Sequence, residues 1–455
     1  MVLSYFRKAT RGRDEPSSVQ SVPEAYDSAT SEASLARVNE PALAGKPAAA
    51  PPDAAGFVAY TWLLNGKKQV IGYRLRWLPH ADHDRSDALA QLHALVNTLT
   101  ECFFDAENGW TMGNVGLSFD VTPENVAALY GSKLPAKNVV LCWQSQDFSN
   151  PDIGETLVAL RQKGFALLLC GEPPEDKELR KLVTHFDVGA GDAQSLETCR
   201  SLTSHVVNPI ATRMDGWNGF EACAAKRVPV LVAPDQEPPA LTGTRPPLQP
   251  ETLLLVRLLQ MVQRNDDVRV IEAALKHDVA LTYRFLRHIN SPAVGAGVEI
   301  HSLRHAVAML GYTRLFRWLS MLLATSDVKS SPPYLARQAL VRGRFVELLG
   351  TALIGPKHAD NLFLVGMFSV LDQLLGVPMT ELFERVQLAD SVRAAIVDQA
   401  GMYGPFLSLA IACESGADEM EALAEALFLT PTRVNTAHLG ALVWAYQITR
   451  AETAR

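Results

Sequence analysis

The chain has 455 residues, with 42 Lys and Arg against 49 Asp and Glu, and a formal net charge of −7. This acidic balance excludes a chain-wide basic footprint for nucleic acid, and an apolar fraction of 48% is ordinary for a globular protein. The six cysteines are widely spaced and form no Cys-x-x-Cys pair, which indicates free thiols in a reducing compartment.

Residues 1–55 are rich in Ala, Pro, Ser and Glu and have no apolar period, which predicts a disordered leader. The basic N-terminus lacks the apolar stretch of a signal peptide. No later run reaches the roughly 18 apolar residues that a membrane span requires. We therefore expect a cytoplasmic protein without a membrane span.

Residues 56–236 alternate short β-type runs with helical segments, a pattern typical of a mainly parallel sheet, open or closed. The dipeptide Asn65-Gly66 between the first two runs favours a hairpin. The region is shorter than the roughly 250 residues of a complete (β/α)₈ barrel, so we expect an abbreviated or distorted barrel. The expected strands are 57–63, 70–78, 115–121, 139–143, 166–170, 186–189, 210–214 and 228–233.

A Pro-rich stretch then predicts an extended linker over residues 237–250. From residue 251 to 455 almost every segment has a helical period, so we expect an all-α domain. Asp278 is expected to cap one helix, and Ser302 to cap the next, which Gly311 would end.

Residues 57–77 resemble the opening hairpin of the EAL phosphodiesterase domain. In that family the second strand carries Glu-Ala-Leu or Glu-Leu-Leu, and its Glu binds a catalytic metal. The matching triplet here is Arg74-Leu75-Arg76. A guanidinium stays charged at any working pH and cannot ligate a cation. The resemblance therefore implies the frame of a cyclic di-GMP hydrolase without its first metal ligand.

The helical region resembles the HDOD domain, a relative of the metal-dependent HD phosphohydrolases, over residues 276–291, 300–311 and 363–372. Residues 401–414 resemble the HDOD version that follows a degenerate EAL domain. The two resemblances imply an α/β plus all-α chain: a degenerate, abbreviated TIM-like barrel of EAL type over 56–236, then an all-helical HDOD domain over 251–455.

EAL enzymes hold two divalent cations with carboxylates and an Asn, and these cations activate a water. By the resemblance, only three residues at or near the family's ligand positions still offer a ligand oxygen: Asp120, Asp192 and Asp215. A hard cation needs several oxygen ligands at once. The resemblance thus implies no metal, no cofactor and no catalytic residue in the barrel. The family's first metal-ligand position falls on Arg74. Its other metal-ligand and catalytic positions fall on Asp120, on Cys142, on Cys170-Gly171, near Ala190 with Asp192 following, and near Asp215.

The dipeptide His277-Asp278 has the letters of the HD motif, but the HDOD register places Asp278 at a helix start. By the same register, the phosphohydrolase pair falls near Ser369-Val370, and neither residue is a strong metal ligand. The resemblance therefore implies no metal site in the helical domain either.

The segment His80-Ala-Asp82-His83-Asp84 places four potential metal ligands within five residues. It follows a predicted strand and precedes a predicted helix. We interpret it as a solvated polar loop rather than a metal site.

Together these observations predict a signal-transduction scaffold that is not an enzyme and acts through contacts with other signalling proteins in a cyclic di-GMP, motility or biofilm pathway. One alternative is a cyclic di-GMP receptor without hydrolysis, in which Arg74 and Arg76 contact phosphate. Another is an active phosphodiesterase with a rebuilt metal site. Nucleic acid is not an expected partner.

Overall fold

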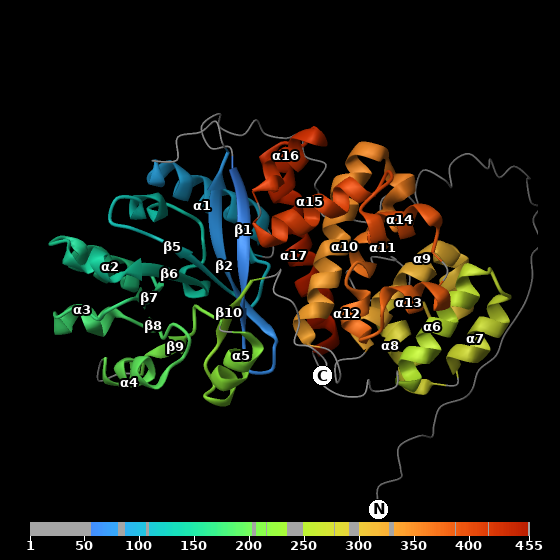
Figure 1. Cartoon of the computed structure of the whole chain (residues 1–455), viewed down its shortest axis with the longest axis horizontal. Helices are drawn as coiled ribbons and strands as arrows, with labels where there is room; N and C mark the ends of the chain where they lie inside the picture. The colour runs from blue at the N-terminus through green and yellow to red at the C-terminus, as the bar shows by residue number, and fades with distance from the viewer. Residues whose placement is uncertain are drawn as a thin grey trace, which may run out of the picture. The chain divides into compact units, whose positions relative to one another are not determined.

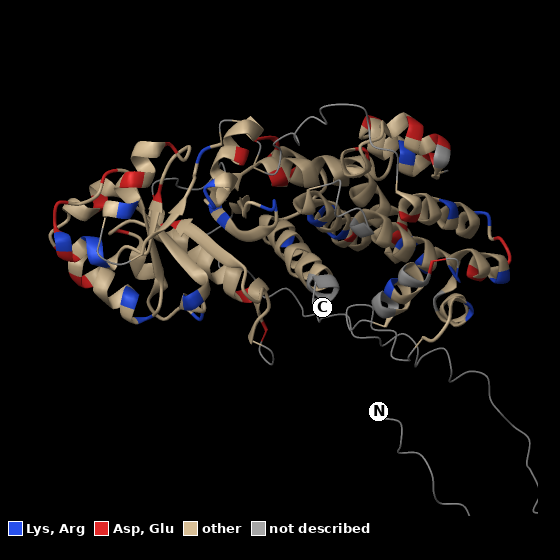
Figure 2. Cartoon of the chain, turned by 90° about the horizontal axis from the view of Figure 1, so that it is seen from below, with Lys and Arg blue, Asp and Glu red and all other residues tan. Residues whose placement is uncertain are grey.

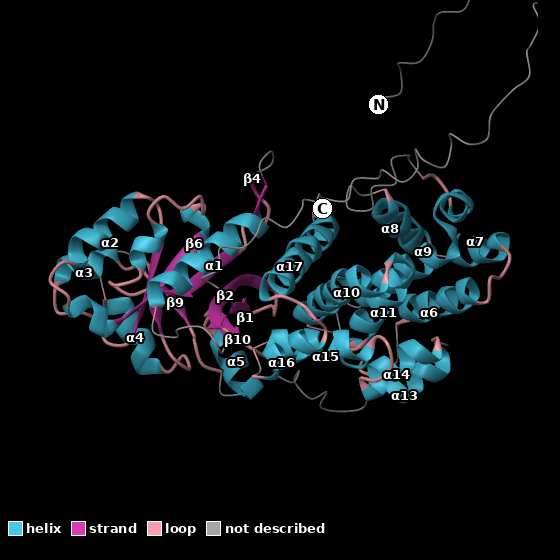
Figure 3. Ribbon diagram, turned by 90° about the horizontal axis from the view of Figure 1, so that it is seen from above, coloured by secondary structure: helices cyan, strands magenta, loops and turns pink. Residues whose placement is uncertain are grey.

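The computed structural model has a β/α barrel in its first half and a bundle of helices in its second (Figures 1 and 3). The predicted leader, and the predicted linker as far as residue 248, lie outside the described residues. The structure describes residues 56–80, 87–105, 109–202, 206–214, 216–233, 249–276, 278–290, 300–326, 332–386, 388–416 and 418–453.

Eight strands form one sheet in the order β10-β1-β2-β5-β6-β7-β8-β9. Neighbours from β2 to β9 are parallel, whereas β1 runs antiparallel to both β2 and β10. The strands are β1 (Gly56–Leu64), β2 (Val70–Pro79), β5 (Gly116–Asp120), β6 (Val139–Gln144), β7 (Ala166–Cys170), β8 (His185–Asp187), β9 (Asn208–Ile210) and β10 (Val230–Val232), with a small separate pair β3 (Phe104–Asp105) and β4 (Gly109–Trp110).

Ala211, directly after β9, brings the two ends of the sheet together. Its N–H donates to the carbonyl of Pro229 at 2.9 Å, and its carbonyl accepts from the N–H of Leu231 at 2.8 Å. The sheet is therefore a nearly closed barrel. Seven predicted strands overlap the observed ones by two residues or more, whereas the strand predicted at 210–214 shares only Ile210 with β9. The barrel is abbreviated where β5 joins β6, because two 3₁₀ turns, η1 (Val126–Leu129) and η2 (Ala136–Asn138), stand in place of a helix.

The predicted hairpin between β1 and β2 is confirmed, but its turn is longer than two residues. The carbonyl of Asn65 accepts from the N–H of Lys68 at 2.8 Å, and Lys68 adopts a left-handed φ of 57°. The Asn65 side chain also accepts from the N–H groups of Lys67 and Gln69, at 2.9 and 3.0 Å. These side-chain hydrogen bonds stabilise the longer loop.

Helices cover the outside of the barrel between the strands (Figure 1). Asp87 caps the first of them, because its side chain accepts from the N–H of Ala90 at 2.9 Å. They are α1 (Ala88–Phe103), α2 (Ile153–Gln162), α3 (Lys177–Leu182), α4 (Ala193–Ser201) and α5 (Gly216–Ala225), with the 3₁₀ turn η3 (Ser145–Ser149).

The second half is helical throughout its described residues (Figure 3). Both predicted caps are confirmed: Asp278 accepts from Leu281 N–H at 2.9 Å, and Ser302 Oγ from His305 N–H at 3.1 Å. Gly311, with a φ of 76°, interrupts α9 as predicted. The helices are α6 (Pro250–Gln263), α7 (Val268–Lys276), α8 (Val279–Ile289), α9 (Leu303–Ser326), α10 (Pro333–Ile354), α11 (Ala359–Phe368), α12 (Leu371–Leu375), α13 (Met379–Arg385), α14 (Asp390–Asp398), α15 (Gly404–Ser415), α16 (Glu419–Ala426) and α17 (Pro431–Thr453), with the 3₁₀ turn η4 (Pro356–His358).

Strand β1 joins the two halves, because α15 and α17 pack against it. Asn435 of α17 accepts from the N–H of Val58 at 2.9 Å and donates to the carbonyl of Gly56 at 2.8 Å. Trp62 of β1 packs on Tyr334 of α10, with ring centroids 5.1 Å apart. One hydrophobic core therefore continues from the barrel into the bundle, and all described residues lie in one compact unit, Lys46–Arg455.

Basic and acidic residues are interspersed along the elements of both halves in Figure 2. None of the described helices combines the length and the apolar content that a membrane crossing needs.

Candidate functional site: the barrel mouth and the helical core

The carboxyl ends of the parallel strands form the barrel mouth, the usual place for a binding site in this architecture. At this end, Arg74 of β2 and Asp120 of β5 form an ion pair, with Nη2 and Oδ1 2.5 Å apart. The side chain of Arg74 is 18% exposed and that of Asp120 is 48% exposed. The pair therefore lies at the solvent boundary, with the guanidinium on the inner side.

Burial disfavours the Arg74 cation, but Cys142 and Asp120 face it and the pKa of the guanidinium lies above its ordinary value. The mouth thus has a permanent positive charge at the position that the EAL resemblance gives to a metal-binding Glu. Asp120 is paired with that charge, so its carboxylate is not free to serve a cation alone.

Two cysteines fill the barrel beneath this ion pair. Cys142 of β6 and Cys170 of β7 belong to a small apolar cluster with Leu168, Ile210 and Leu231. Burial raises the pKa of both thiols, to about 12 for Cys170, with nearby Asp187 adding to the effect there. The thiols are therefore neutral, and they serve as packing groups rather than nucleophiles.

Gly171 directly follows Cys170 and has a φ of 98°. A Cβ at this position would lie 2.9 Å from Ser145 Oγ. Both the backbone conformation and the close approach require glycine here.

Asp187, at the end of β8, is a residue of the mouth that sequence reasoning misses. Its carboxylate accepts from the hydroxyl of Thr212 at 2.6 Å and from the N–H of Gly189 at 2.7 Å. The signal available in the sequence is an acid within the short predicted strand 186–189.

Of the other two acids of the predicted set, the structure describes only Asp192. Asp192 caps α4 by accepting from the N–H of Ser195 at 2.8 Å, and this hydrogen bond lowers the pKa of its carboxyl. Because its side chain already satisfies the helix start, Asp192 has a structural role. Asp215 lies outside the described residues.

In the helical half, Ser369 lies in a buried polar network, and Val370 is buried next to it. Ser369 Oγ accepts from Arg342 Nη1 at 2.9 Å and donates to the carbonyl of Gly366 at 2.7 Å. Arg342 also binds Glu414, Nε to Oε1 at 2.9 Å and Nη2 to Oε2 at 2.6 Å. The HDOD resemblance places the HD pair of the phosphohydrolases at Ser369 and Val370. The charged group that contacts Ser369 there is the guanidinium of Arg342, which cannot ligate a cation.

This network lies against β1. Burial raises the pKa of Tyr60, and Glu414 raises it further. Tyr60 contacts the ring of His438 on α17, with centroids 5.0 Å apart. Tyr60 also contacts Tyr73 of β2 edge-on at 5.5 Å. A chain of buried side chains therefore runs from the helical core to the strand that holds Arg74.

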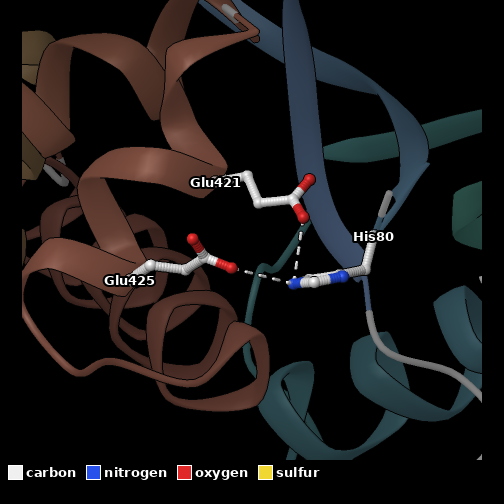
Figure 4. Close-up of side chains that lie close together, drawn as sticks. All are labelled: His80, Glu421 and Glu425. Carbon is white, nitrogen blue, oxygen red and sulfur yellow. Dashed lines mark ion pairs between the residues drawn. The ribbon is translucent and has the colours of Figure 1, made fainter. Parts of the chain in front are cut away.

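Two other sequence predictions have different outcomes. His277 lies outside the described residues, as do Asp82, His83 and Asp84. The prediction of a solvated loop is wrong for His80, which is 18% exposed and lies 3.0 Å from Glu421 of α16. His80 is sheltered because α16, which is far from it in the sequence, lies beside the end of β2 (Figure 4).

The HDOD domain model matches residues 247–388, so the helical half contains an HDOD domain. The match begins a few residues before the predicted boundary.

Two relatives are similar in sequence. Cyclic di-GMP phosphodiesterase CdgJ of Vibrio cholerae is 33% identical over 163 residues, which cover 36% of this chain and 38% of that protein. The Bacillus subtilis protein YuxH, which is uncharacterized, is 26% identical over 400 residues, covering 79% of this chain and 90% of that protein. The matching segment thus spans well under half of the Vibrio protein.

A solved structure, the manganese and cyclic di-GMP complex of BlrP1 from Klebsiella pneumoniae, is 12% identical with a TM-score of 0.30, and covers 40% of this chain and 55% of that chain. A similarity this slight carries no argument about this chain.

One sequence prediction is corrected by these findings. The prediction that the chain is not an enzyme is wrong, because the Vibrio relative at 33% identity is named a phosphodiesterase. The prediction was based on the replaced ligand positions at Arg74, Cys142 and Cys170. Such replacements concern single positions, whereas the name of the Vibrio relative concerns the activity of that protein.

Proposed function

We propose that this chain transmits signals in a cyclic di-GMP pathway, with the barrel and the HDOD domain acting as one body through contacts with other signalling proteins. The name of the Vibrio relative and the HDOD match support the pathway. The buried join at β1, where Asn435 is hydrogen-bonded to the backbone of Gly56 and Val58, supports joint action.

The join is the observation that carries the proposal. Arg74 lies on β2, which is hydrogen-bonded to β1, and α15 and α17 pack against β1. A ligand or partner that binds at the mouth therefore contacts a pair of strands that is in contact with the helical domain. The buried contacts among Tyr73, Tyr60 and His438 continue that path into α17.

The barrel over 56–236 is, in this proposal, a derived EAL domain, and 251–455 is the HDOD domain. Arg74, Cys142, Cys170 and Gly171 then shape the mouth by charge and packing. Ser369 and Val370 serve the packing of the helical core.

A second candidate is the binding or hydrolysis of cyclic di-GMP at the mouth, favoured by the name of the Vibrio relative. Arg74 supplies a fixed cation suited to a phosphate, provided that the ligand competes with Asp120 for it.

The test uses the full chain and a mouth variant, Arg74→Ala with Asp120→Ala. Calorimetry with cyclic di-GMP, and product analysis with Mg²⁺ or Mn²⁺, examine the second candidate. Affinity capture from the native host, followed by binding measurements with the purified partner, examines the first. The exposed pair Lys181 and Glu178 on α3, both changed to Ala, is the matched control.

A partner bound by the wild type and the control, but weakened in the mouth variant, supports signalling through the mouth. Turnover of cyclic di-GMP without any captured partner would replace the first candidate with the second. No partner, no heat and no turnover would overturn both.

A further inference from the structure

Three side chains from both halves of the chain converge beside the barrel rim (Figure 4). His80 follows the end of β2, and Glu421 and Glu425 lie one turn apart on the same face of α16. The Nε2 atom of His80 is 3.0 Å from Glu421 Oε1 and 3.8 Å from Glu425 Oε1. One ligand atom from each residue lies within 4.8 Å of the other two.

These separations fit a shared cation. Zinc binds imidazole nitrogen and carboxylate oxygen at about 2.0–2.2 Å, so neighbouring ligands of a tetrahedral ion lie roughly 3.4 Å apart. The two nitrogen–oxygen separations of His80, 3.0 and 3.8 Å, lie on either side of that value. The side chain of Glu425, which makes the longer contact, is 66% exposed.

The surroundings also fit. Two glutamates at i and i+4 repel each other on a helix unless a positive charge lies between them. His80 and Glu421 are sheltered, with side chains 18% and 25% exposed, whereas Glu425 faces solvent. Two of the three candidate ligands are therefore sheltered from solvent, and the third is accessible to it.

We propose that His80, Glu421 and Glu425 bind one divalent transition-metal ion, with zinc the best fit to this mixed nitrogen and oxygen set. Three protein ligands leave a fourth position for water. This site is separate from the Arg74–Asp120 pair, and the inference does not depend on the proposed function.

The ion would link the barrel to the helical domain. His80 directly follows the strand that contains Arg74, and α16 follows α15, which packs against β1. Bound metal stabilises the folded chain by mass action, because the three ligands come together only when both halves are folded and joined.

The test is equilibrium dialysis of the chelator-treated full chain against micromolar zinc, without any nucleotide. We expect one ion per chain. His80→Ala and Glu425→Gln should each weaken binding by more than roughly 100-fold, a loss beyond the roughly 10–100-fold that is typical of side chains that only support a ligand. Exposed His93 on α1 and exposed Glu419 on α16 provide the controls His93→Ala and Glu419→Gln, which should bind as the wild type does.

A melting-temperature rise on zinc addition in the wild type, absent in His80→Ala, is the second expected result. Cobalt in place of zinc reports the ligands, because a thiolate charge-transfer band would assign the ion to a cysteine. That band, unchanged zinc affinity in His80→Ala, or no binding at micromolar zinc would each overturn the proposal.

Discussion

Arg342 of α10 and Glu414 of α15 form a two-point ion pair in the core of the helical domain, with N–O distances of 2.9 and 2.6 Å. Their side chains are 9% and 2% exposed. Gln338 donates a third hydrogen bond to the same carboxylate at 2.8 Å. Such a pair sets the arrangement of the helices, since each charge is costly to bury without the other.

Breaking this pair should therefore destabilise the protein strongly. Glu414→Gln leaves the Arg342 cation buried without its counter-charge, and we expect a loss of about 3–5 kcal/mol in the free energy of unfolding. Urea denaturation followed by circular dichroism measures it. The double variant Arg342→Met with Glu414→Leu should lose less than Glu414→Gln alone.

The exposed pair Lys181 and Glu178 provides the comparison, because Lys181→Ala should cost no more than about 1 kcal/mol. If Glu414→Gln cost no more than this control, the pair would not be a main support of the core.

Asn435→Ala tests the join at β1. The change leaves the N–H of Val58 and the carbonyl of Gly56 buried without their partner, and each such group costs about 1–3 kcal/mol. We expect lower thermal stability and faster hydrogen exchange at Val58. Thr432→Ala, at an exposed position near the start of the same helix, should change neither. Unaltered exchange at Val58 would mean that the join does not depend on Asn435.

Most of the strands and the starts of two helices could be predicted because their signals are local. Apolar β-type runs gave most of the strands, and the caps at Asp278 and Ser302 lie within three residues of the N–H groups that they accept from. The hairpin turn was less predictable, since the side chain of Asn65 favours a longer loop than the letters Asn-Gly indicate.

The site was less predictable because its contacts join distant residues. Arg342 and Glu414 are 72 positions apart, and each resembles a solvated residue on its own helix. His80 meets Glu421 only after α16 packs beside β2. Arg74 could be identified from the sequence, but its pairing with Asp120 depends on the register of two parallel strands.

The cysteine thiols should be slow to react in the folded chain. Burial, reinforced by Asp187, raises the pKa of Cys170 to about 12 from an ordinary 9.0. At mildly alkaline pH this leaves about 1,000-fold less thiolate than an exposed cysteine has. A chromogenic disulfide reagent should therefore react with Cys170 far more slowly in the native chain than in urea. The difference between the wild type and a Cys170→Ser variant separates the reaction of Cys170 from that of the other thiols.

The same shift predicts a pH effect. The folded state keeps the Cys170 proton to higher pH than the unfolded state, so this contribution to stability is complete below the ordinary pKa and is lost as pH rises from about 9 toward about 12. Cys170→Ser should flatten that part of the stability profile. Rapid modification of native Cys170 at neutral pH would contradict both expectations.

His438 should make the fold sensitive to acid. Burial lowers the pKa of its imidazole to about 4, although Glu414 acts in the opposite direction. Below an ordinary pKa of 6.5 the unfolded state binds a proton that the folded state does not, so stability falls as pH drops from about 6.5 to about 4. His438→Phe removes this proton and keeps a ring against Phe345, whose centroid is 4.6 Å away. Among the described residues, Nε2 of His438 also has no hydrogen-bond partner, so the variant loses no hydrogen bond from that atom.

The measurement is the free energy of unfolding for wild type and His438→Phe from about pH 7 to about pH 5, where a shift of one pKa unit corresponds to about 1.4 kcal/mol. The difference should grow in favour of the variant as pH falls, toward about 2 kcal/mol at the acid end. His185, whose pKa burial also lowers to about 4, retains its own acid sensitivity in both proteins and cancels from the difference. His93→Ala should leave the profile unchanged, because that side chain is exposed. Parallel profiles for wild type and His438→Phe would show that His438 accepts its proton in the folded core without penalty.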